Sequence, residues 1–81
     1  MTIMRGRGII VPIDWDEHGN VVAVAISTHG EDEYVIENQE KVEELKALIT
    51  QEVEIIGEVR KKDGKRIIKV AEYKVKKSDT K

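Results

Sequence analysis

The sequence predicts an all-β fold with a single helix: a five-stranded antiparallel barrel in which the helix lies between the third and fourth strands. Two observations lead to this prediction. Apolar and polar residues alternate in five segments separated by turn-forming residues, and the hydrophobic period changes from two to about 3.6 only between residues 39 and 49. At 81 residues the chain is short for a domain, so we expect one domain over residues 1–81, folded at about 4–75.

The first three strands are expected at residues 4–15, 21–27 and 33–37. Pro12 lies inside the first strand and has no N–H to give to a sheet, which predicts an edge, a bulge or a bend at that point. In the second strand, bulky aliphatic residues alternate with two alanines, so one face is expected to be bulky and the other small.

The change of period defines the helix. Asn38 is a favourable N-cap, and Glu40 suits the positive end of the helix dipole. The apolar residues that follow have the spacing of one helical face: Val42, Leu45, Leu48 and Ile49. We therefore expect a helix of about three turns over residues 39–49.

The last two strands are expected at residues 51–60 and 66–75, joined at Asp63 and Gly64, a pair typical of tight hairpins. The apolar residues of the last strand change parity halfway along, which predicts a bulge near Ala71. Residues 76–81 form a charged tail with nothing to bury, and we expect them to be disordered.

The core has to be aliphatic, because phenylalanine and cysteine are absent. The residues expected in it are Ile10, Val22, Val24, Ile26, Ile36, Leu45, Leu48, Val53, Ile55 and Val70. Gly57 interrupts a β-branched run of the fourth strand, which predicts a crowded or bent point.

The first strand and the last two strands carry a resemblance to a known fold. Gly6, Gly8 and Pro12 would allow the first strand to serve two sheets, and segments 53–59 and 67–70 resemble the fourth and fifth strands of bacterial OB domains of the anticodon-binding kind. The order of the elements also resembles that of an OB fold. The resemblance implies a Greek-key barrel that binds oligonucleotides, oligosaccharides or proteins. The main alternative is another small barrel, such as an SH3-like one.

No group of residues has the spacing of a catalytic site. No glycine pattern matches a phosphate-binding loop, and a small barrel filled by its own side chains leaves little room for a cleft that shifts pKa values. Two turns hold potential metal ligands: Asp14, Asp16 and His18 in one, and His29, Glu31 and Asp32 in the other. Each lacks the spacing of a structural zinc site. We therefore expect no catalysis, no cofactor and no metal.

Charge is unevenly distributed along the chain. Residues 1–40 carry a net charge of −6 and residues 41–81 carry +4, within a total of −2. The densest basic cluster lies at the last hairpin: Arg60, Lys61, Lys62, Lys65 and Arg66. In an OB-like fold this loop borders the binding groove, which makes it a candidate for phosphate contact. The alternative is that the lysines only keep an exposed hairpin soluble.

Trp15 and Tyr34 are the candidate stacking residues. An OB-like fold would place Trp15 beside the ligand face, where an aromatic ring can stack on a base or sugar. Tyr34 has the same two possible roles, stacking on a ligand or packing on the barrel. The alternative for Trp15 is a cap over one end of the barrel, and Tyr73 is expected to pack.

Two hypotheses follow for a non-enzymatic binding module. The first is weak, sequence-indifferent binding of single-stranded nucleic acid. Two features argue against it: the first loop is acidic, and the chain has few aromatic residues. The second is a protein-interaction module that uses a sheet edge or the small face of the second strand to bind a protein or a second copy. An oligosaccharide or small ligand is a third option.

No stretch has the length of a signal-peptide core or a membrane span, so we expect a cytoplasmic location and no membrane contact.

Overall fold

The computed structural model describes residues 2–30 and 32–76, which contain five strands, one α-helix and one short 3-10 helix. The strands are β1 (Thr2–Trp15), β2 (Val21–Thr28), β3 (Glu33–Ile36), β4 (Glu52–Lys62) and β5 (Lys65–Val75). The α-helix α1 (Gln39–Leu45) continues into the 3-10 turn η1 (Lys46–Leu48), so the helix predicted at residues 39–49 is confirmed. Of the predicted disordered tail, residues 77–81 lie outside the described part of the chain.

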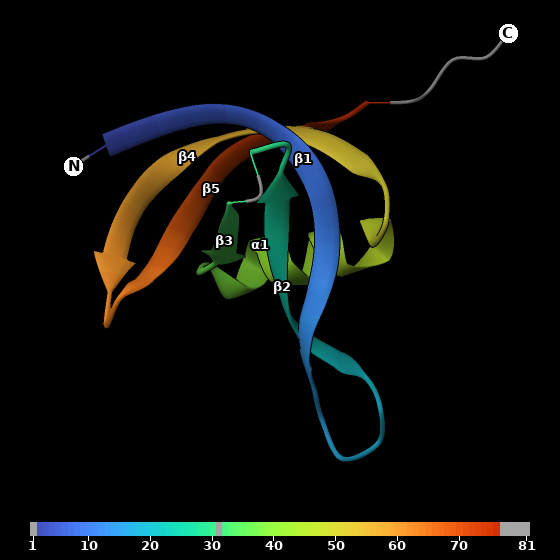
Figure 1. Cartoon of the computed structure of the whole chain (residues 1–81). Helices are drawn as coiled ribbons and strands as arrows, with labels where there is room; N and C mark the ends of the chain where they lie inside the picture. Colours follow the sequence, from blue (N-terminus) through green and yellow to red (C-terminus); the bar gives the residue numbers. More distant parts are fainter. Residues whose placement is uncertain (1, 31, 77–81) are drawn as a thin grey trace, which may run out of the picture.

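The strands close into a barrel in the order β1-β2-β3-β5-β4 (Figure 1). Every neighbouring pair is antiparallel except β3 and β5, which run parallel. The prediction of an antiparallel barrel is therefore wrong at this one pair. The reason is topological, because a closed ring with an odd number of strands requires at least one parallel pair. The closure and the helix between β3 and β4 give an OB-fold-like Greek-key barrel, as the sequence predicts.

β1 is long and belongs to two sheets. It pairs with β4 from Thr2 to Ile9 and with β2 from Gly8 onward, so two positions have strands on both sides. At Gly8 an added Cβ would lie 2.4 Å from the backbone oxygen of Ser27, which leaves room only for glycine. The irregularity predicted at Pro12 is also confirmed, since the β1–β2 register shifts directly after it.

The core cluster contains eight of the ten residues predicted for it, together with Val42 and Ile68. The members shared with the prediction are Ile10, Val24, Ile26, Ile36, Leu45, Val53, Ile55 and Val70. Leu48 is only partly buried and packs against this cluster. Fully burying one such aliphatic side chain contributes about 1.5–3 kcal/mol to folding.

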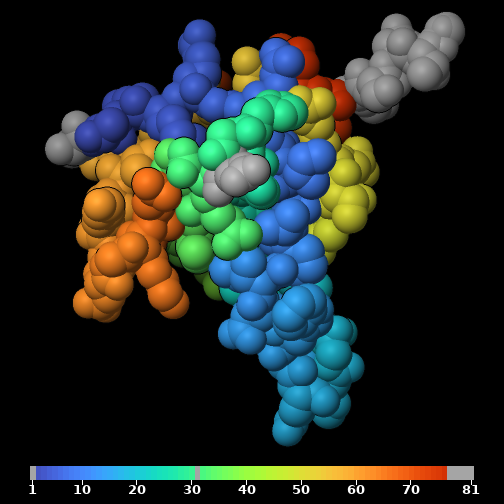
Figure 2. Space-filling view, in the orientation of Figure 1, coloured from blue at the N-terminus to red at the C-terminus, as the bar shows by residue number. Residues whose placement is uncertain are grey.

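Val22 is not in the core, and its side chain is 40% exposed. The β1–β2 register passes over Ile13 and Val22, neither of which has a partner in the ladder. The strand changes parity at this bulge, so Val21 packs against the core instead. Beyond it, the β1–β2 hairpin protrudes from the body of the molecule (Figure 2).

Asn38 occupies the N-cap position, but its side chain makes no capping hydrogen bond. Its amide instead pairs with the backbone of Val70 on β5: Nδ2 donates to the Val70 oxygen at 2.9 Å, and Oδ1 accepts from the Val70 nitrogen at 3.1 Å. The backbone N–H of Glu37 donates to the oxygen of Ile68 at 2.8 Å. Asn38 thus extends the short β3–β5 ladder by one residue with its side chain.

The β4–β5 hairpin turns at Asp63 and Gly64, both with positive φ (53° and 80°), as a tight two-residue turn requires. In its ladder Ile56 faces Glu72 and Gly57 faces Val70, which leaves Ala71 as the extra residue of a bulge, as predicted. Gly57 is crowded as predicted, because a Cβ there would lie 2.5 Å from the Lys69 oxygen. Among the described residues, no helix has the length and apolar character needed to cross a membrane.

Candidate ligand-binding face

An aliphatic row crosses the outside of four neighbouring strands. Val11 on β1 lies opposite Ala25 on β2, Ala25 opposite Val35 on β3, and Val35 opposite Ile67 on β5. Successive side chains on a strand point to opposite faces, and the residues next to these four include the core members Ile10, Val24, Ile26, Ile36 and Ile68. The row therefore lies on the outer surface of the barrel.

Ala25 is the smallest and most buried residue of this row. It has no exposed surface although it is not a member of the core cluster, while Val11 and Val35 beside it are half-buried. Directly opposite side chains in a sheet have Cβ atoms only about 4.5–5.5 Å apart. Val11 and Val35 therefore flank the buried alanine on its two sides.

A groove of about 530 Å³ lies beside this row, between the end of β1, β3 and the tip of the β4–β5 hairpin. Its lining residues are Ile13, Glu33, Val35, Gly64, Lys65 and Arg66. The groove thus combines aliphatic walls with two cations and one carboxylate. In Figure 1 the β1–β2 and β4–β5 hairpins both project away from the barrel, with β3 between them.

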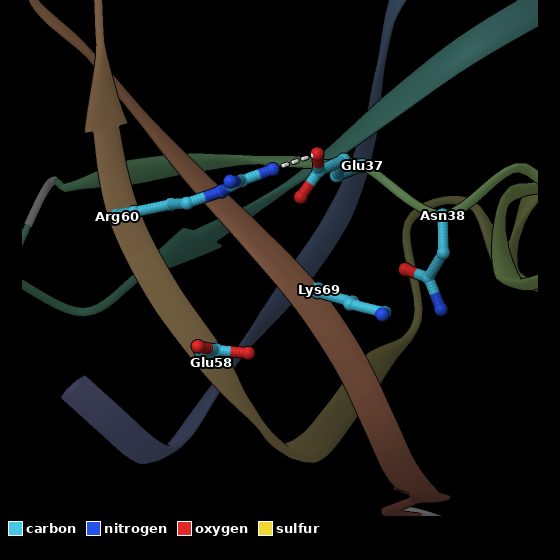
Figure 3. Close-up of a pocket in the computed structure, with 5 residues that line it drawn as sticks. All are labelled: Glu37, Asn38, Glu58, Arg60 and Lys69. Carbon is cyan, nitrogen blue, oxygen red and sulfur yellow. Dashed lines mark hydrogen bonds and ion pairs between the residues drawn. The ribbon is translucent and has the colours of Figure 1, made fainter. Parts of the chain in front are cut away.

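The structure divides the basic cluster of the β4–β5 hairpin into two groups. Arg60 forms an ion pair with Glu37, beside Lys69 in a pocket of about 320 Å³ (Figure 3), and Arg66 pairs with Asp32 at 3.2 Å. Lys61, Lys62 and Lys65 are exposed and have no ion pair within residues 2–30 and 32–76. These three lysines are the cations that a ligand would meet without first breaking an ion pair.

Tyr34 and Arg66 lie together at the β3–β5 seam. The guanidinium carbon of Arg66 is 5.9 Å from the centroid of the Tyr34 ring, and Tyr34 also packs against the core. A base could stack on Tyr34 only after displacing Arg66, which is also paired with Asp32.

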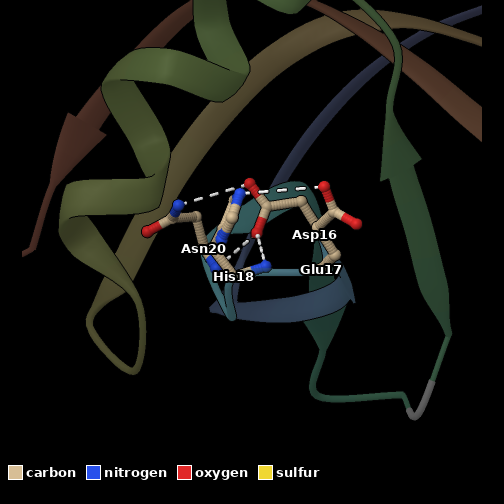
Figure 4. Close-up of polar contacts among 4 residues, drawn as sticks. All are labelled: Asp16, Glu17, His18 and Asn20. Carbon is tan, nitrogen blue, oxygen red and sulfur yellow. Dashed lines mark hydrogen bonds and ion pairs between the residues drawn. The ribbon is translucent and has the colours of Figure 1, made fainter.

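Trp15 is 52% exposed at the start of the β1–β2 loop, so half of its surface is available to a ligand. The loop after it is organised by the Asp16 carboxylate (Figure 4), whose Oδ1 accepts from the backbone N–H groups of His18 and Asn20, each at 2.9 Å. These hydrogen bonds, that from Asn20 above all, lower the pKa of Asp16 from its ordinary value of 3.8. Asp16 therefore stays charged, which keeps this loop acidic.

The two histidines among the potential metal ligands each lie beside one glutamate. His18 lies 3.7 Å from Glu17, and His29 lies 3.4 Å from Glu52 on β4. Within the described residues, no three histidines or carboxylates come together in a metal-binding arrangement. Glu31, one of the residues considered for the second turn, lies outside the described part of the chain.

Tyr73 on β5 packs against the core, as expected, and its hydroxyl donates to the Glu44 carboxylate on α1 at 2.9 Å. This hydrogen bond, burial and the charge of Glu44 raise the pKa of Tyr73 above its ordinary value of 10.0. Lys41 lies 5.6 Å from the centre of the same ring. Tyr73 thus joins α1 to the barrel.

The basic residues of the β4–β5 hairpin and Trp15 are exposed at strand ends. The sequence prediction misses the aliphatic row. Its signal is present in the sequence, because Val11, Val35 and Ile67 each adjoin a core residue on the same strand and so point outward. No protein-family model, curated protein or solved structure matches the chain.

Proposed function

We propose that the protein is a non-enzymatic binding module whose ligand is an extended segment of another protein, bound across the outer face of β1, β2, β3 and β5. The observation that carries the proposal is the row Val11, Ala25, Val35 and Ile67. An extended chain that crosses these strands can place its side chains against the two valines that flank Ala25.

The charges on either side of this face favour a protein segment over a nucleic acid. Lys65 and Ile13 both line the groove, and Ile13 is followed in the chain by the acidic residues Asp14, Asp16 and Glu17. A polyanion is attracted by the lysines and repelled by this loop. A peptide with acidic residues at one end and basic residues at the other can meet the lysines with its acidic end and the acidic loop with its basic end.

The test is an amide NMR titration of the full chain with a synthetic peptide that has alternating valines in its centre, glutamates at one end and lysines at the other. We expect shifts at Ala25, Val35 and Ile67. A control peptide with glutamates at both ends should bind several-fold more weakly, because one end then meets the acidic loop.

Val35→Asp should abolish the shifts at the neighbouring row positions, whereas Val22→Asp, which lies outside the face, should leave them unchanged. Melting curves of both variants confirm that the barrel is intact. The proposal fails if the peptide shifts only residues outside the row, or if the two peptides bind equally well.

A second candidate is weak binding of single-stranded nucleic acid. It is favoured by the three exposed lysines Lys61, Lys62 and Lys65 and by the exposed ring of Trp15. Kinship with bacterial OB domains of the anticodon-binding kind, suggested by residues 53–59 and 67–70, belongs with this candidate. In the same titration, a mixed oligonucleotide that shifts residues 61–65 and the Trp15 indole more strongly than the peptide shifts the row would favour it.

A further inference from the structure

The first half of β1 has a strand on one side only. Residues Thr2–Arg7 pair with β4, whereas the pairing with β2 begins at Gly8. In the described part of the chain, no strand pairs with the other side of this segment. Thr2–Arg7 therefore form an open sheet edge, outside the ring formed by the rest of β1.

The hydrogen bonds of Ile10 show which backbone groups lie on this edge. Its N–H donates to Gln51 at 3.3 Å and its oxygen accepts from Thr50 at 2.8 Å, so both groups of Ile10 point toward the β4 side. The direction alternates along a strand, and the β1–β4 register has no shift between Thr2 and Ile9. The N–H and C=O groups of Ile3, Arg5 and Arg7 therefore point to the open side.

The side chains beside this edge are partly apolar. Ile3 is 65% exposed, the largest exposure of any described large aliphatic residue, and it borders a groove of about 240 Å³. Ile56, Gly57, Val70 and Ala71 line the same groove together with Glu58 and Lys69. Proteins usually protect an open edge with proline, charged side chains or a bulge. Thr2–Arg7 contains neither proline nor a bulge, and its charged residues are Arg5 and Arg7.

We propose that this edge pairs with the same edge of a second copy, antiparallel, about a two-fold axis that passes beside Met4. In this register Ile3 of each copy faces Arg5 of the other, and their outward backbone groups exchange both hydrogen bonds. The two Met4 residues then face each other as a close, non-hydrogen-bonded pair. The two barrels share one continuous sheet through β4 and β1 of each copy.

Charge selects this register over its neighbours. Centring the pair on Arg5 would place two arginines directly opposite each other, and β4 offers Arg5 only Ile56 as its direct neighbour. Like charges in directly opposite positions destabilise a sheet. Centring the pair on Ile3 would shorten the contact, because fewer residues then overlap. The Met4-centred register therefore combines the longest contact with no opposed arginines.

A second copy fits this edge because a single strand edge, read antiparallel, is complementary to itself. The contact is short, and interfaces of this size are weak. We therefore expect a dimer in concentration-dependent exchange with the monomer, and sedimentation velocity of the full chain over a concentration series should show it. A sedimentation coefficient of a monomer throughout the series would overturn the proposal.

Cross-linking tests the register directly, because the chain contains no cysteine. Met4→Cys should form a disulfide-linked dimer under mild oxidation several-fold faster than Val22→Cys, a control on an exposed strand position away from the edge. Arg5→Cys tests the alternative register. Equal rates for Met4→Cys and Val22→Cys, or faster cross-linking through Arg5→Cys, would overturn the proposed pairing.

A proline variant separates self-association from folding. Arg5→Pro removes an N–H that points to the open edge and leaves the pairing of its neighbours with β4 intact, so the protein should melt as a folded monomer. Arg5→Lys retains the N–H and should still dimerise. If Arg5→Pro folds and associates as strongly as wild type, the edge is not the interface. The groove bordered by β3 is distant from these changes, so peptide binding there is tested independently.

Discussion

Two glycines set how closely neighbouring strands approach in this barrel. A Cβ on Gly8 would lie 2.4 Å from the Ser27 oxygen, and one on Gly57 would lie 2.5 Å from the Lys69 oxygen. Both obstacles are backbone atoms of a paired strand, which can move only by opening the sheet. These positions therefore require glycine for space, since neither has a positive φ.

Gly57→Val should lower the free energy of unfolding by about 1–3 kcal/mol, because the added side chain overpacks the β4–β5 pair. Gly30→Ala is the matched control, since its nearest neighbour to an added Cβ is 3.8 Å away and its φ is not positive. Urea unfolding of both variants measures the difference. Equal midpoints would show that the strands yield at Gly57 without cost.

One substitution distinguishes the observed pairing of Asn38 with Val70 from the capping role that the sequence predicts. Aspartate caps helices as well as asparagine does, but it has no N–H to donate to the Val70 oxygen, which now contacts Nδ2 at 2.9 Å. Asn38→Asp should therefore cost about 1–3 kcal/mol of stability by leaving this carbonyl opposite a carboxylate. If the residue acted mainly as a cap, thermal unfolding would show Asn38→Asp close to wild type and Asn38→Ala clearly weaker.

At the scale of elements, the change of hydrophobic period was enough to place the strands and the helix. The prediction of a buried side chain failed at Val22, because side chains alternate between the two faces of a strand only while the ladder is regular. Pro12 signals a bulge, but no local pattern tells which residue of the facing strand loses its partner. The parallel β3–β5 pair is a consequence of ring closure, and the pairing of Asn38 with Val70 joins residues far apart in the sequence.

The candidate site was predictable only in part. The lysines of the β4–β5 hairpin follow from composition and turn chemistry. The ion pairs of Arg60 with Glu37 and of Arg66 with Asp32 depend on how β3 meets the hairpin, which sequence spacing does not specify. The aliphatic row needs the registers of four strands at once, so only the structure assembles it.

The β1–β2 loop provides a pH-dependent prediction. The folded state lowers the pKa of Asp16 below 3.8 through hydrogen bonds from Asn20, His18 and Gly19. A carboxyl group with a depressed folded pKa stabilises the fold above its unfolded pKa, and that contribution is lost as the pH falls through the folded value. We therefore expect the loop to loosen only below about pH 3.8.

Carboxyl carbon shifts of Asp16 followed with pH should show a midpoint below 3.8, together with movement of the His18 and Asn20 amide resonances. Asp16→Asn keeps an acceptor oxygen but removes the charge, so its amide resonances should not titrate in this range. A midpoint at or above the ordinary value would show that the loop is open in solution.

At the scale of the whole molecule, the two halves of the chain fold into one barrel in which one hairpin loop is acidic and another hairpin tip is basic. The acidic β1–β2 loop and the basic β4–β5 tip lie on separate hairpins, so the asymmetry of the sequence persists as a separation in space (Figure 1). A ligand that spans the outer face therefore meets opposite charges at its two ends. This arrangement allows one set of substitutions to distinguish the two ligand classes.

Replacing Lys61, Lys62 and Lys65 together with Gln removes three cations from the tip and leaves the Asp63-Gly64 turn intact. If single-stranded nucleic acid is the ligand, its affinity should fall steeply at low salt. The slope of log affinity against log salt should flatten by about 2, from about 0.7 for each lost phosphate contact. Fluorescence anisotropy with a mixed oligonucleotide over a salt series measures both quantities.

A control variant with Lys46, Lys74 and Lys76 replaced by Gln has the same net charge but leaves the tip unchanged. If the tip itself contacts phosphates, only the first variant flattens the salt slope; if affinity follows net charge alone, the two variants behave alike and the oligonucleotide has no defined site. For the proposed peptide ligand, the tip variant should lose only the contribution of the glutamate end and should retain the shifts at Ala25 and Val35. Loss of those shifts as well would mean that the aliphatic row does not hold the peptide.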